Sequence, residues 1–407
     1  MGVDSSGSRE ESVPVRALQG VRVIDLSRFV AGPFCCQILG DNGADVVKVE
    51  KPDGEPARQM PPFARGESLY FIAYNGSKRG ITINFRSTEG LAILRRLIAK
   101  ADVVVENFRA GTMEKMGLGY EEMAAANPGL IMVSISGFGF EGPYIGRPAF
   151  DEIIQSMSGL VSMTGEGDRP PMLTGTYVAD FVTGIYGALG AMLALSLRSK
   201  TGRGQWVQMN LLQSLISILN TTVSRYLLLG EAPRRQGNRN ALIAPGNIYP
   251  AQDGHVTIEC LTQDMWEDLA RAIGREELIR DPRFVDVVNR KQHADELDRE
   301  VQTWMEVRTT EQIVSILERH SIPCGPVLDI PALVKDPQFQ ANQTVVQVEY
   351  PGLGPVPVLA PPIRLSGDAT PRRGRPPRLG EHTQEVLSEW LGLSPGDIET
   401  LRAGNAL

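Results

Sequence analysis

Short apolar runs alternate with amphipathic segments along the first half of the chain. The runs are rich in Val and Ile, and near-continuous apolar runs of this kind are typical of strands buried on both faces of a parallel sheet. We expect these strands at 22–26, 45–50, 80–85, 102–108 and 130–136.

Between the expected strands, apolar residues recur at the spacing of a helix, at 32–43 and 87–101. The first of these segments closes at Gly43, and the second opens with Ser87, a residue type that caps helices. Strands alternating with helices indicate a parallel sheet covered on both faces. The first 210 residues therefore predict an α/β, doubly wound (Rossmann-like) domain.

The pattern changes after about residue 230. A hairpin is expected at 246–261, with its turn at Asp253 and Gly254, and a second hairpin at 345–365. Helical patterns lie at 262–274, 293–306 and 309–320, and a strand is expected at 324–330. The last helix should begin at Ser394, with Pro395 in its first turn and Gly404 near its end.

These changes predict four regions. We expect a polar, disordered leader at 1–17, the N-terminal part of a large domain at 18–228, a smaller α/β domain at 229–340, and a C-terminal part at 341–407 that returns to the large domain.

The longest apolar run, Ile185 to Leu197, is too short to cross a bilayer and predicts a buried helix. The leader lacks the apolar core of a signal peptide, although Gly2 and Ser6 fit a loose acylation pattern. We therefore expect a soluble, cytoplasmic protein that does not bind membranes.

Charge and cysteine content narrow the possible partners. The net charge of −7 argues against a nucleic-acid-binding protein, which would show a basic surface. The cysteines, Cys35, Cys36, Cys260 and Cys324, form no CxxC pair and no metal-type cluster with histidine. We expect no metal, and a reducing compartment.

One acid, Asp180, stands directly before the long apolar helix. Asp is a favoured N-cap residue, because its carboxylate accepts hydrogen bonds from the free N–H groups of the first turn. The same position would keep a partly buried carboxylate ionised in the field of the helix dipole, and such a carboxylate is a usable nucleophile. The residues alone leave both interpretations open.

Other polar groups point to a phosphorylated ligand. Asn107, Phe108 and Arg109 end an expected strand, where ligands of parallel sheets gather. Asn75 and Lys78 precede another strand, and together these groups suggest a nucleotide with several phosphates, although each alone is compatible with a solvated loop. The string GFGFEG at 137–142 is not a dinucleotide motif, because Pro143 follows where a helix should open.

Several long strings resemble the class III coenzyme A-transferases (CaiB/BaiF family), which include formyl-CoA transferase and carnitine CoA-transferase. The strings are LQGVRVIDLSRFVAGPFCCQILGDNGADVVKVEKP, YNGSKRGITINF, VVVENFRAGTMEKMGLGY, SGFGFEGPY, AFDEIIQSMSGL, SKTGRGQWVQMNLL, DGHVTIECL and GEHTQEVL. They keep the family order from Leu18 to about Trp390. The resemblance implies a large doubly wound domain formed by both termini, a smaller domain, and an interlocked homodimer.

The resemblance also implies the chemistry. Asp180 matches the family nucleophile, which attacks an acyl-CoA thioester to give a mixed anhydride and then an aspartyl-CoA thioester that a carboxylic acid attacks. The partners would be acyl-CoA and a carboxylic acid, with coenzyme A thioester as substrate and no permanently bound cofactor. The residues that would contact CoA are Asn107, Phe108, Arg109, Asn75, Lys78 and Lys51.

Two departures from formyl-CoA transferase bear on the substrate. Val30 stands where formyl-CoA transferase has a glutamine, and the segment 237–246 lacks that enzyme's run of glycines. These differences favour a larger acyl group, on a small mono- or dicarboxylate from a succinyl-CoA-type donor. Arg65 or Arg239 would bind the second carboxylate.

Two other functions compete with CoA transfer: an α-methylacyl-CoA racemase-like isomerase and a catalytically silent CoA-binding paralogue. The racemase relatives carry a histidine in a G-H-D string, and Phe150 occupies that place here. Phenylalanine cannot carry a proton, and it would instead shield an anhydride as an apolar wall. The sequence therefore favours CoA transfer.

Overall fold

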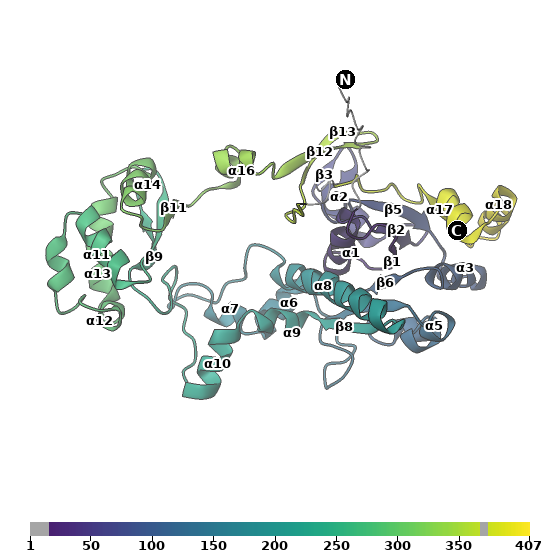
Figure 1. Cartoon of the computed structure of the whole chain (residues 1–407), viewed down its shortest axis with the longest axis horizontal. Helices are drawn as coiled ribbons and strands as arrows, with labels where there is room; N and C mark the ends of the chain where they lie inside the picture. Colours follow the sequence, from purple (N-terminus) through teal and green to yellow (C-terminus); the bar gives the residue numbers. More distant parts are fainter. Residues whose placement is uncertain (1–15, 367–372) are drawn as a thin grey trace, which may run out of the picture. The chain divides into compact units, whose positions relative to one another are not determined.

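The computed structural model describes residues 16–366 and 373–407, and it divides into two compact units (Figure 1). The first unit takes the residues up to 158 together with 175–220 and 341–407, and the second takes 159–174 and 221–340. The expected boundaries did not anticipate that 159–174 belongs with the second unit. Most of the expected leader, including Gly2, lies outside the described residues.

A six-stranded parallel sheet forms the centre of the first unit, in the order β5-β2-β1-β6-β7-β8. Its strands are β1 (Arg22–Asp25), β2 (Asp45–Glu50), β5 (Lys78–Thr82), β6 (Val103–Glu106), β7 (Ile131–Ser136) and β8 (Trp206–Asn210). Every neighbouring pair is parallel, which confirms the predicted central sheet. From β1 the chain continues outward to β2, and from β6 it continues outward to β7 on the opposite side. The loops that follow these two central strands therefore run in opposite directions and leave a crevice at the carboxyl ends of the strands.

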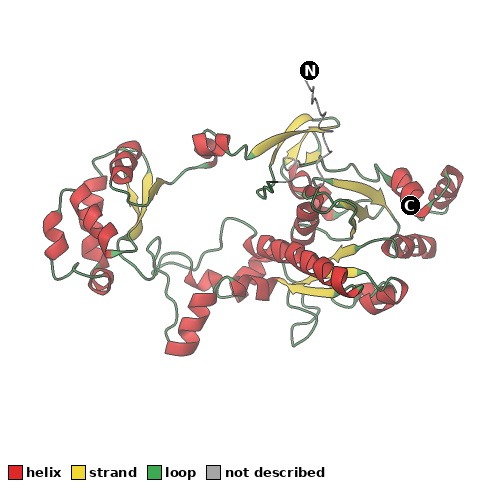
Figure 2. Cartoon of the chain, in the orientation of Figure 1, coloured by secondary structure: helices red, strands yellow, loops and turns green. Residues whose placement is uncertain are grey.

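Helices cover both faces of this sheet (Figures 1 and 2). One face packs against α1 (Ala31–Asp41) and α8 (Val178–Thr201), and the other against α3 (Thr88–Ile98) and α5 (Tyr120–Ala126). The remaining helices of this unit are α2 (Leu69–Tyr74), α4 (Thr112–Lys115), α6 (Asp151–Met157), α9 (Leu211–Ser217), α17 (Thr383–Leu391), α18 (Pro395–Ala403) and the 3₁₀ turn Pro56–Gln59. Gly184 lets α8 approach α1 closely, because a Cβ there would lie 2.8 Å from the carbonyl oxygen of Ala31.

The C-terminal helices belong to the core of the first unit. Val386, Leu387 and Trp390 of α17 are buried in the same apolar cluster as Ile81 of β5 and Leu94 of α3. The backbone N–H of Gly80 also donates to Nδ1 of His382, at 3.0 Å. The last residues of the chain therefore cover one face of a sheet whose first five strands come from the first hundred and forty residues.

Two short hairpins complete the first unit. The antiparallel strands β12 (Val345–Tyr350) and β13 (Gly354–Leu359) pack against Ile72 of α2, and β3 (Phe63–Ala64) pairs with β4 (Glu67–Ser68).

The second unit has its own sheet and core. Strands β9 (Gly246–Pro250), β10 (His255–Glu259) and β11 (Cys324–Pro326) form an antiparallel sheet, which includes the expected hairpin. The helices are α7 (Leu160–Met163), α11 (Gln263–Ala272), α12 (Val287–Gln292), α13 (Ala294–Met305), α14 (Thr310–Arg319), α15 (Ile330–Leu333) and the 3₁₀ turn Glu276–Arg280, while α10 (Asn220–Leu229) and α16 (Pro337–Ala341) reach its borders. The strand expected at 324–330 is shorter, because Asp329 caps α15.

Helix α8 departs from the expected buried helix. Its small residues, such as Gly187 and Ala191, face the interior, but Ile185, Leu189 and Leu193 are 53%, 49% and 62% exposed. Of the helices in the described chain, α8 alone is long and apolar enough to cross a membrane by length and composition, a test that core helices of soluble proteins also pass. The sequence predicted the helix correctly but not its uncovered apolar face.

Candidate active site

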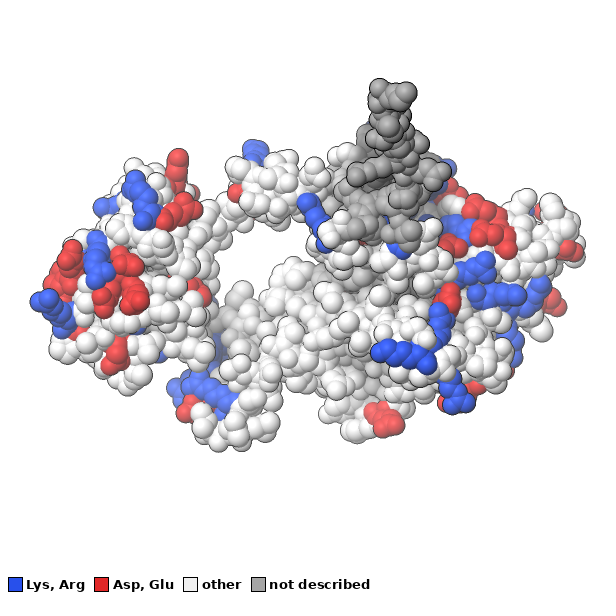
Figure 3. Space-filling view, viewed as in Figure 1, with Lys and Arg blue, Asp and Glu red and all other residues white. Residues whose placement is uncertain are grey.

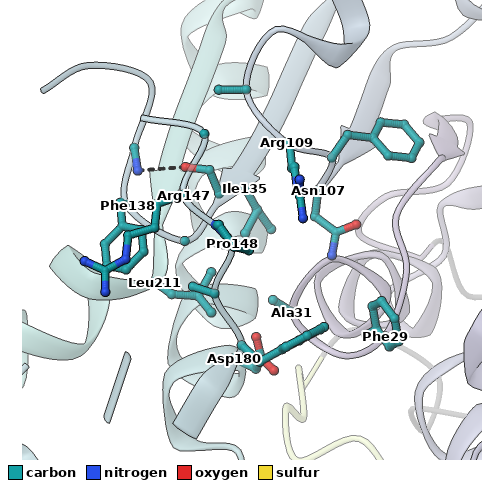
Figure 4. Close-up of a pocket in the computed structure, with 18 of the residues that line it drawn as sticks. Phe29, Ala31, Asn107, Arg109, Ile135, Phe138, Arg147, Pro148, Asp180 and Leu211 are labelled. Atoms are coloured by element: carbon teal, nitrogen blue, oxygen red, sulfur yellow. Dashed lines mark hydrogen bonds between the residues drawn. The ribbon is translucent and has the colours of Figure 1, made fainter. Parts of the chain in front are cut away.

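The divergence of β1 and β6 opens a cavity of about 250 Å³ in the first unit (Figure 4). Loops that follow β1, β6 and β7 supply most of its wall, as expected for the carboxyl ends of parallel strands. The segment 144–150 and the first turn of α8 close the remainder. The cavity brings together Val30, Asn107, Phe108, Arg109, Phe150 and Asp180, six of the residues singled out from the sequence.

Asp180 is the third residue of α8, and the N-cap is Tyr177. The interpretation of Asp180 as an N-cap is therefore wrong. Its carboxylate lines the cavity, and burial together with the nearby Asp151 and Glu152 raises its pKa to about 7. Burial and like charge thus outweigh the helix dipole that was expected to keep this carboxylate fully ionised.

Asn107 joins the loops that follow β1 and β6. Its Oδ1 accepts from the backbone N–H of Arg28 at 2.8 Å, and its Nδ2 donates to the carbonyl oxygen of Arg28 at 2.7 Å. The Arg28 guanidinium lies 5.1 Å from the centre of the Phe108 ring. This pair of loops therefore presents a cation stacked on an aromatic ring to the cavity.

Three guanidinium groups line the cavity, those of Arg28, Arg109 and Arg147 (Figure 4 labels the last two). Arg147 lies over the rings of Phe138 and Tyr144, at 5.4 and 5.2 Å from their centres. None of the three forms an ion pair with a carboxylate in the described part of the chain. The sequence analysis missed Arg28 and Arg147, although both lie in loops directly after apolar strands.

Phe29, beside Arg28, has a left-handed backbone conformation, with φ of 66°. Its N–H donates to the Glu55 carboxylate at 3.1 Å, and Glu55 pairs with the buried ammonium of Lys48 at 2.7 Å. Such strained residues persist where the surrounding structure holds them, and they gather at functional sites.

Glu106, at the end of β6, is buried and accepts a hydrogen bond from the backbone N–H of Phe108 at 2.8 Å. Burial raises its pKa to about 7, even though Ser134 and the Phe108 N–H both stabilise the ionised form. Ser134 in turn accepts from the indole N–H of Trp206 at 3.0 Å. A buried carboxylate therefore supports the turn that carries Asn107, Phe108 and Arg109.

Lys78 and Asn75 lie beneath the cavity wall and not in it. The Lys78 ammonium is buried and donates to Asp25 at 2.7 Å, to the carbonyl oxygen of Pro33 at 2.9 Å and to Asn75 Oδ1 at 2.9 Å. These three contacts use all of its hydrogens, so the placement argues against the predicted direct contact with CoA. Burial opposes the charge of Asp25, but Lys48 and Lys78 hold its pKa near 2. The buried Asp25–Lys78 ion pair instead fixes the start of α1, because Lys78 also donates to the carbonyl oxygen of Pro33.

Lys51 lines a smaller adjoining cavity of about 60 Å³ that shares Arg28 and Phe108 with the main one. Its ammonium makes an exposed ion pair with Asp53 at 3.2 Å. Lys51 therefore stands next to the stacked pair, with a charge that solvent can reach.

The four residues predicted to contact the acyl group separate into two pairs. Val30 and Phe150 line the main cavity, where the Phe150 ring meets Phe29 edge to face at 5.5 Å. Arg65 lies on the exposed β3–β4 turn and does not line the cavity. Arg239 belongs to the second unit, where Asp298 and Asp295 pair with it at 2.6 and 2.5 Å. The placement of neither arginine supports the predicted carboxylate contact.

No group of three or more His, Cys, Asp and Glu residues that could hold a metal ion occurs within residues 16–366 and 373–407. The charged residues that line the cavity are Asp180, Arg28, Arg109 and Arg147.

The fold and the cavity define a site that carries a carboxylate and can bind an anionic ligand. Comparison with known proteins shows to which class of protein the chain belongs. The model of CoA-transferase family III matches residues 18–383. The chain is 37% identical over 393 residues to succinyl-CoA–D-citramalate CoA-transferase of Chloroflexus aurantiacus, covering 96% of this chain and 98% of the relative. It is 38% identical over 382 residues to succinate–glutarate CoA-transferase of Agrobacterium fabrum, covering 91% and 95%.

A solved structure is also similar. The CaiB/BaiF family protein from Brucella suis superposes with a TM-score of 0.82 at 36% identity, covering 92% of this chain and 99% of that protein. The chain belongs to CoA-transferase family III. It is a class III CoA-transferase, an enzyme whose substrates are CoA thioesters.

Proposed function

We propose that the enzyme moves CoA between small carboxylic acids, with Asp180 as the covalent nucleophile. The observation that carries this proposal is the position of Asp180 in a cavity that also presents three guanidinium groups, none of which pairs with a carboxylate of the described residues. The guanidinium groups attract an anionic thioester, and the Asp180 carboxylate lies near the apolar wall, where it can attack the thioester carbonyl.

Each covalent step exchanges one acyl bond for another. The ionised Asp180 attacks the thioester carbonyl, the C–S bond breaks, and CoA leaves as thiolate with the bonding electrons. The thiolate attacks the Asp180 carbonyl carbon of the anhydride and releases the donor acid. The acceptor carboxylate then attacks the carbonyl carbon of the aspartyl-CoA thioester, the C–S bond breaks, and a second anhydride forms as CoA leaves as thiolate. The thiolate attacks the acyl carbon of the acceptor in this anhydride and frees the Asp180 carboxylate.

An anhydride survives only where water is excluded. Val30 is 1% exposed, and Ala31 and Leu211 are buried, so this part of the apolar wall is shielded from solvent, whereas Phe150 on the same wall is 61% exposed. Phe150 also stands where a racemase would need its histidine. This wall supports a site for acyl transfer and offers no base for proton removal from the α-carbon.

The nucleotide of CoA would bind along the loops after β1 and β6. The Arg28–Phe108 pair and the adjoining cavity with Lys51 suit a stacked purine, and Arg109 suits a phosphate. The pantetheine arm would then reach Asp180 through the main cavity.

A succinyl-CoA-type donor and a small dicarboxylate acceptor fit this enzyme best. Relatives at 37% and 38% identity carry names that specify citramalate, succinate and glutarate. The apolar Val30 in place of a polar contact agrees with an acyl group larger than formyl.

We also propose that the enzyme works as an interlocked homodimer in the cytoplasm. The exposed Ile185, Leu189 and Leu193 form one apolar face of α8, over which Figure 3 shows a largely uncharged surface. Exposed apolar area of this extent marks an interaction surface. The free cysteines agree with a reducing compartment.

A trapping experiment tests the mechanism. Purified enzyme is given succinyl-CoA and then hydroxylamine, and the peptide containing Asp180 should gain the mass of a hydroxamate. Asp180→Ala should lose the adduct and at least ~10³-fold of turnover, as expected for a lost covalent nucleophile. Near-normal activity in this variant would contradict the mechanism. A panel of acyl-CoA donors and acids, read by the mass of new thioesters, identifies the substrates.

A further inference from the structure

The first turn of α8 is capped by a side chain from another helix. The N-cap residue Tyr177 provides no side-chain hydrogen bond to the free N–H groups of this turn. Asp151, the first residue of α6, does so instead: its Oδ1 accepts from the backbone N–H of Asp180 at 3.0 Å, and the N–H of Ala179 also donates to it. A carboxylate twenty-nine positions earlier in the chain thus holds the backbone of the proposed nucleophile.

Asp151 is itself firmly held. It is 1% exposed, and the amide of Gln155, one turn further along α6, donates to its Oδ2. The same amide donates to the carbonyl oxygen of Thr176 at 3.0 Å, just before α8. The two helices are therefore joined by a short chain of hydrogen bonds that ends at the backbone of Asp180.

The two carboxylates differ in their hydrogen bonds. Asp151 accepts from one amide and two backbone N–H groups, whereas the Asp180 carboxylate accepts none from the described residues. Burial raises the pKa of Asp151 as well, but its three donors stabilise its ionised form, so the negative charge of the pair resides on Asp151. Asp180 is the member that takes up a proton, in agreement with its pKa near 7.

The other ionisable groups around Asp180 do not replace this influence. Cys35 of α1 has a pKa raised by burial to about 12 and remains neutral. The groups that face Asp180 or share its cavity are Glu152 of α6, Tyr70 and Tyr74 of α2, Tyr177, and the guanidinium groups of Arg28, Arg109 and Arg147. Burial raises the pKa of Tyr70 and of Tyr74, so both remain neutral. Of the two acids, Asp151 has the larger effect on Asp180.

We propose that Asp151 is a positioning residue that fixes the backbone of Asp180 and whose negative charge favours the acylated forms of Asp180 over its free carboxylate. In the anhydride and in the CoA thioester the acylated Asp180 group itself carries no charge, so forming either one relieves the repulsion between the two carboxylates. The same repulsion makes the free carboxylate a stronger nucleophile. This inference rests on the proposed role of Asp180 and adds the residue that sets its reactivity.

The test compares Asp151→Asn, Asp151→Glu and Glu152→Gln with the wild type across pH 5 to 9. Because Asp180 must be ionised to attack, wild-type kcat should rise with pH to a plateau, with a midpoint near 7. Asp151→Asn removes the charge, so the midpoint should fall by about one pH unit, and the plateau should drop by about tenfold because the nucleophile is weaker. The fraction of enzyme isolated as the Asp180–CoA thioester should fall with it.

The other two variants separate charge from position. Asp151→Glu keeps the charge and displaces the carboxylate, so its midpoint should stay near the wild-type value while its plateau drops. Glu152→Gln removes a nearby charge that makes no hydrogen bond to Asp180 and that affects it less than Asp151 does, so its midpoint and plateau should change less than those of Asp151→Asn. KM for succinyl-CoA should stay within about twofold in all three, because the guanidinium groups are untouched.

The outcomes are distinct. If wild-type Asp180 gives no hydroxamate, the proposed function fails and takes this inference with it. If the hydroxamate forms and Asp151→Asn keeps the wild-type midpoint and plateau, the inference alone is overturned. A folded Asp151→Glu with a wild-type plateau would remove the positioning role. Should Asp151→Asn fail to fold, Asp151→Glu still decides this part.

Discussion

The backbone N–H of Phe108 donates a hydrogen bond to the carboxylate of Glu106, two residues earlier, at 2.8 Å. This contact closes the turn between the end of β6 and the proposed CoA-binding residues. The supporting carboxylate is 3% exposed, and burial raises its pKa to about 7. The turn is thus held by a group whose charge changes in the physiological range, and this leads to a prediction about stability.

Glu106→Gln should become more stable relative to the wild type as pH rises. The folded protein binds the Glu106 proton more tightly than the unfolded chain does, so wild-type stability falls between pH 4.5 and about 7. The difference between the two pKa values corresponds to at most about 3 kcal/mol. Melting temperatures of both proteins at pH 5 and pH 8 measure it. An advantage of the variant that is equal at both pH values would show that Glu106 does not carry the raised pKa.

Arg109→Ala should raise KM for the acyl-CoA substrate by about tenfold and KM for the acceptor acid much less, because it removes a charge-assisted contact to one substrate only. Arg203→Ala is the matched control, because Arg203 is exposed after α8 and does not line the cavity. It should leave both KM values unchanged. Dephospho-CoA thioesters locate the contact. If wild type and Arg109→Ala discriminate equally against them, Arg109 does not bind the 3′-phosphate.

The enzyme should not exchange the α-hydrogen of a 2-methylacyl-CoA. Racemisation requires a base and an acid on opposite faces of that carbon, and Phe150 occupies the place of the required histidine. Incubation in D₂O without an acceptor acid should leave the mass spectrum of the thioester unchanged over many transferase turnover times. Deuterium uptake at a rate comparable to CoA transfer would restore the racemase function.

Sedimentation at low micromolar concentration should give about 89 kDa, twice the 44.4 kDa chain. Leu193→Asp places a charge on the exposed apolar face of α8 and should weaken this assembly. Arg203→Asp introduces the same residue at an exposed position just after α8 and should not weaken it. A stable and active wild-type monomer would contradict the interlocked arrangement.

The central sheet could be predicted because β1, β2, β6 and β7 are buried almost throughout and therefore read as runs rich in Val and Ile. β2 matches its expected range of 45–50, whereas the strand expected at 80–85 spans Lys78–Thr82. The sequence gives no reason to place Lys78 inside a sheet, because only the folded chain supplies Asp25 as its partner. β8 was missed, since Gln208 interrupts its short apolar run.

The cavity was partly predictable for the same reason. Strand ends are visible in the sequence, so Asn107 and Arg109 could be assigned to a common edge of the sheet. Asp151 could not be connected with Asp180, because their contact depends on how α6 meets α8. Arg239 looked like a free cation until the structure gave it Asp295 and Asp298.

The packing of α17 and α18 against β5 and α3 also determines when, during synthesis of the chain, the apolar face of the sheet becomes covered. A nascent chain that has released its first hundred and forty residues holds every strand of the sheet except β8, but the side that Trp390 and Val386 will cover is still open. More than two hundred further residues must leave the ribosome before that surface is sealed. During synthesis this apolar face is exposed to water, and a chain truncated before residue 383 would leave it uncovered and prone to aggregation.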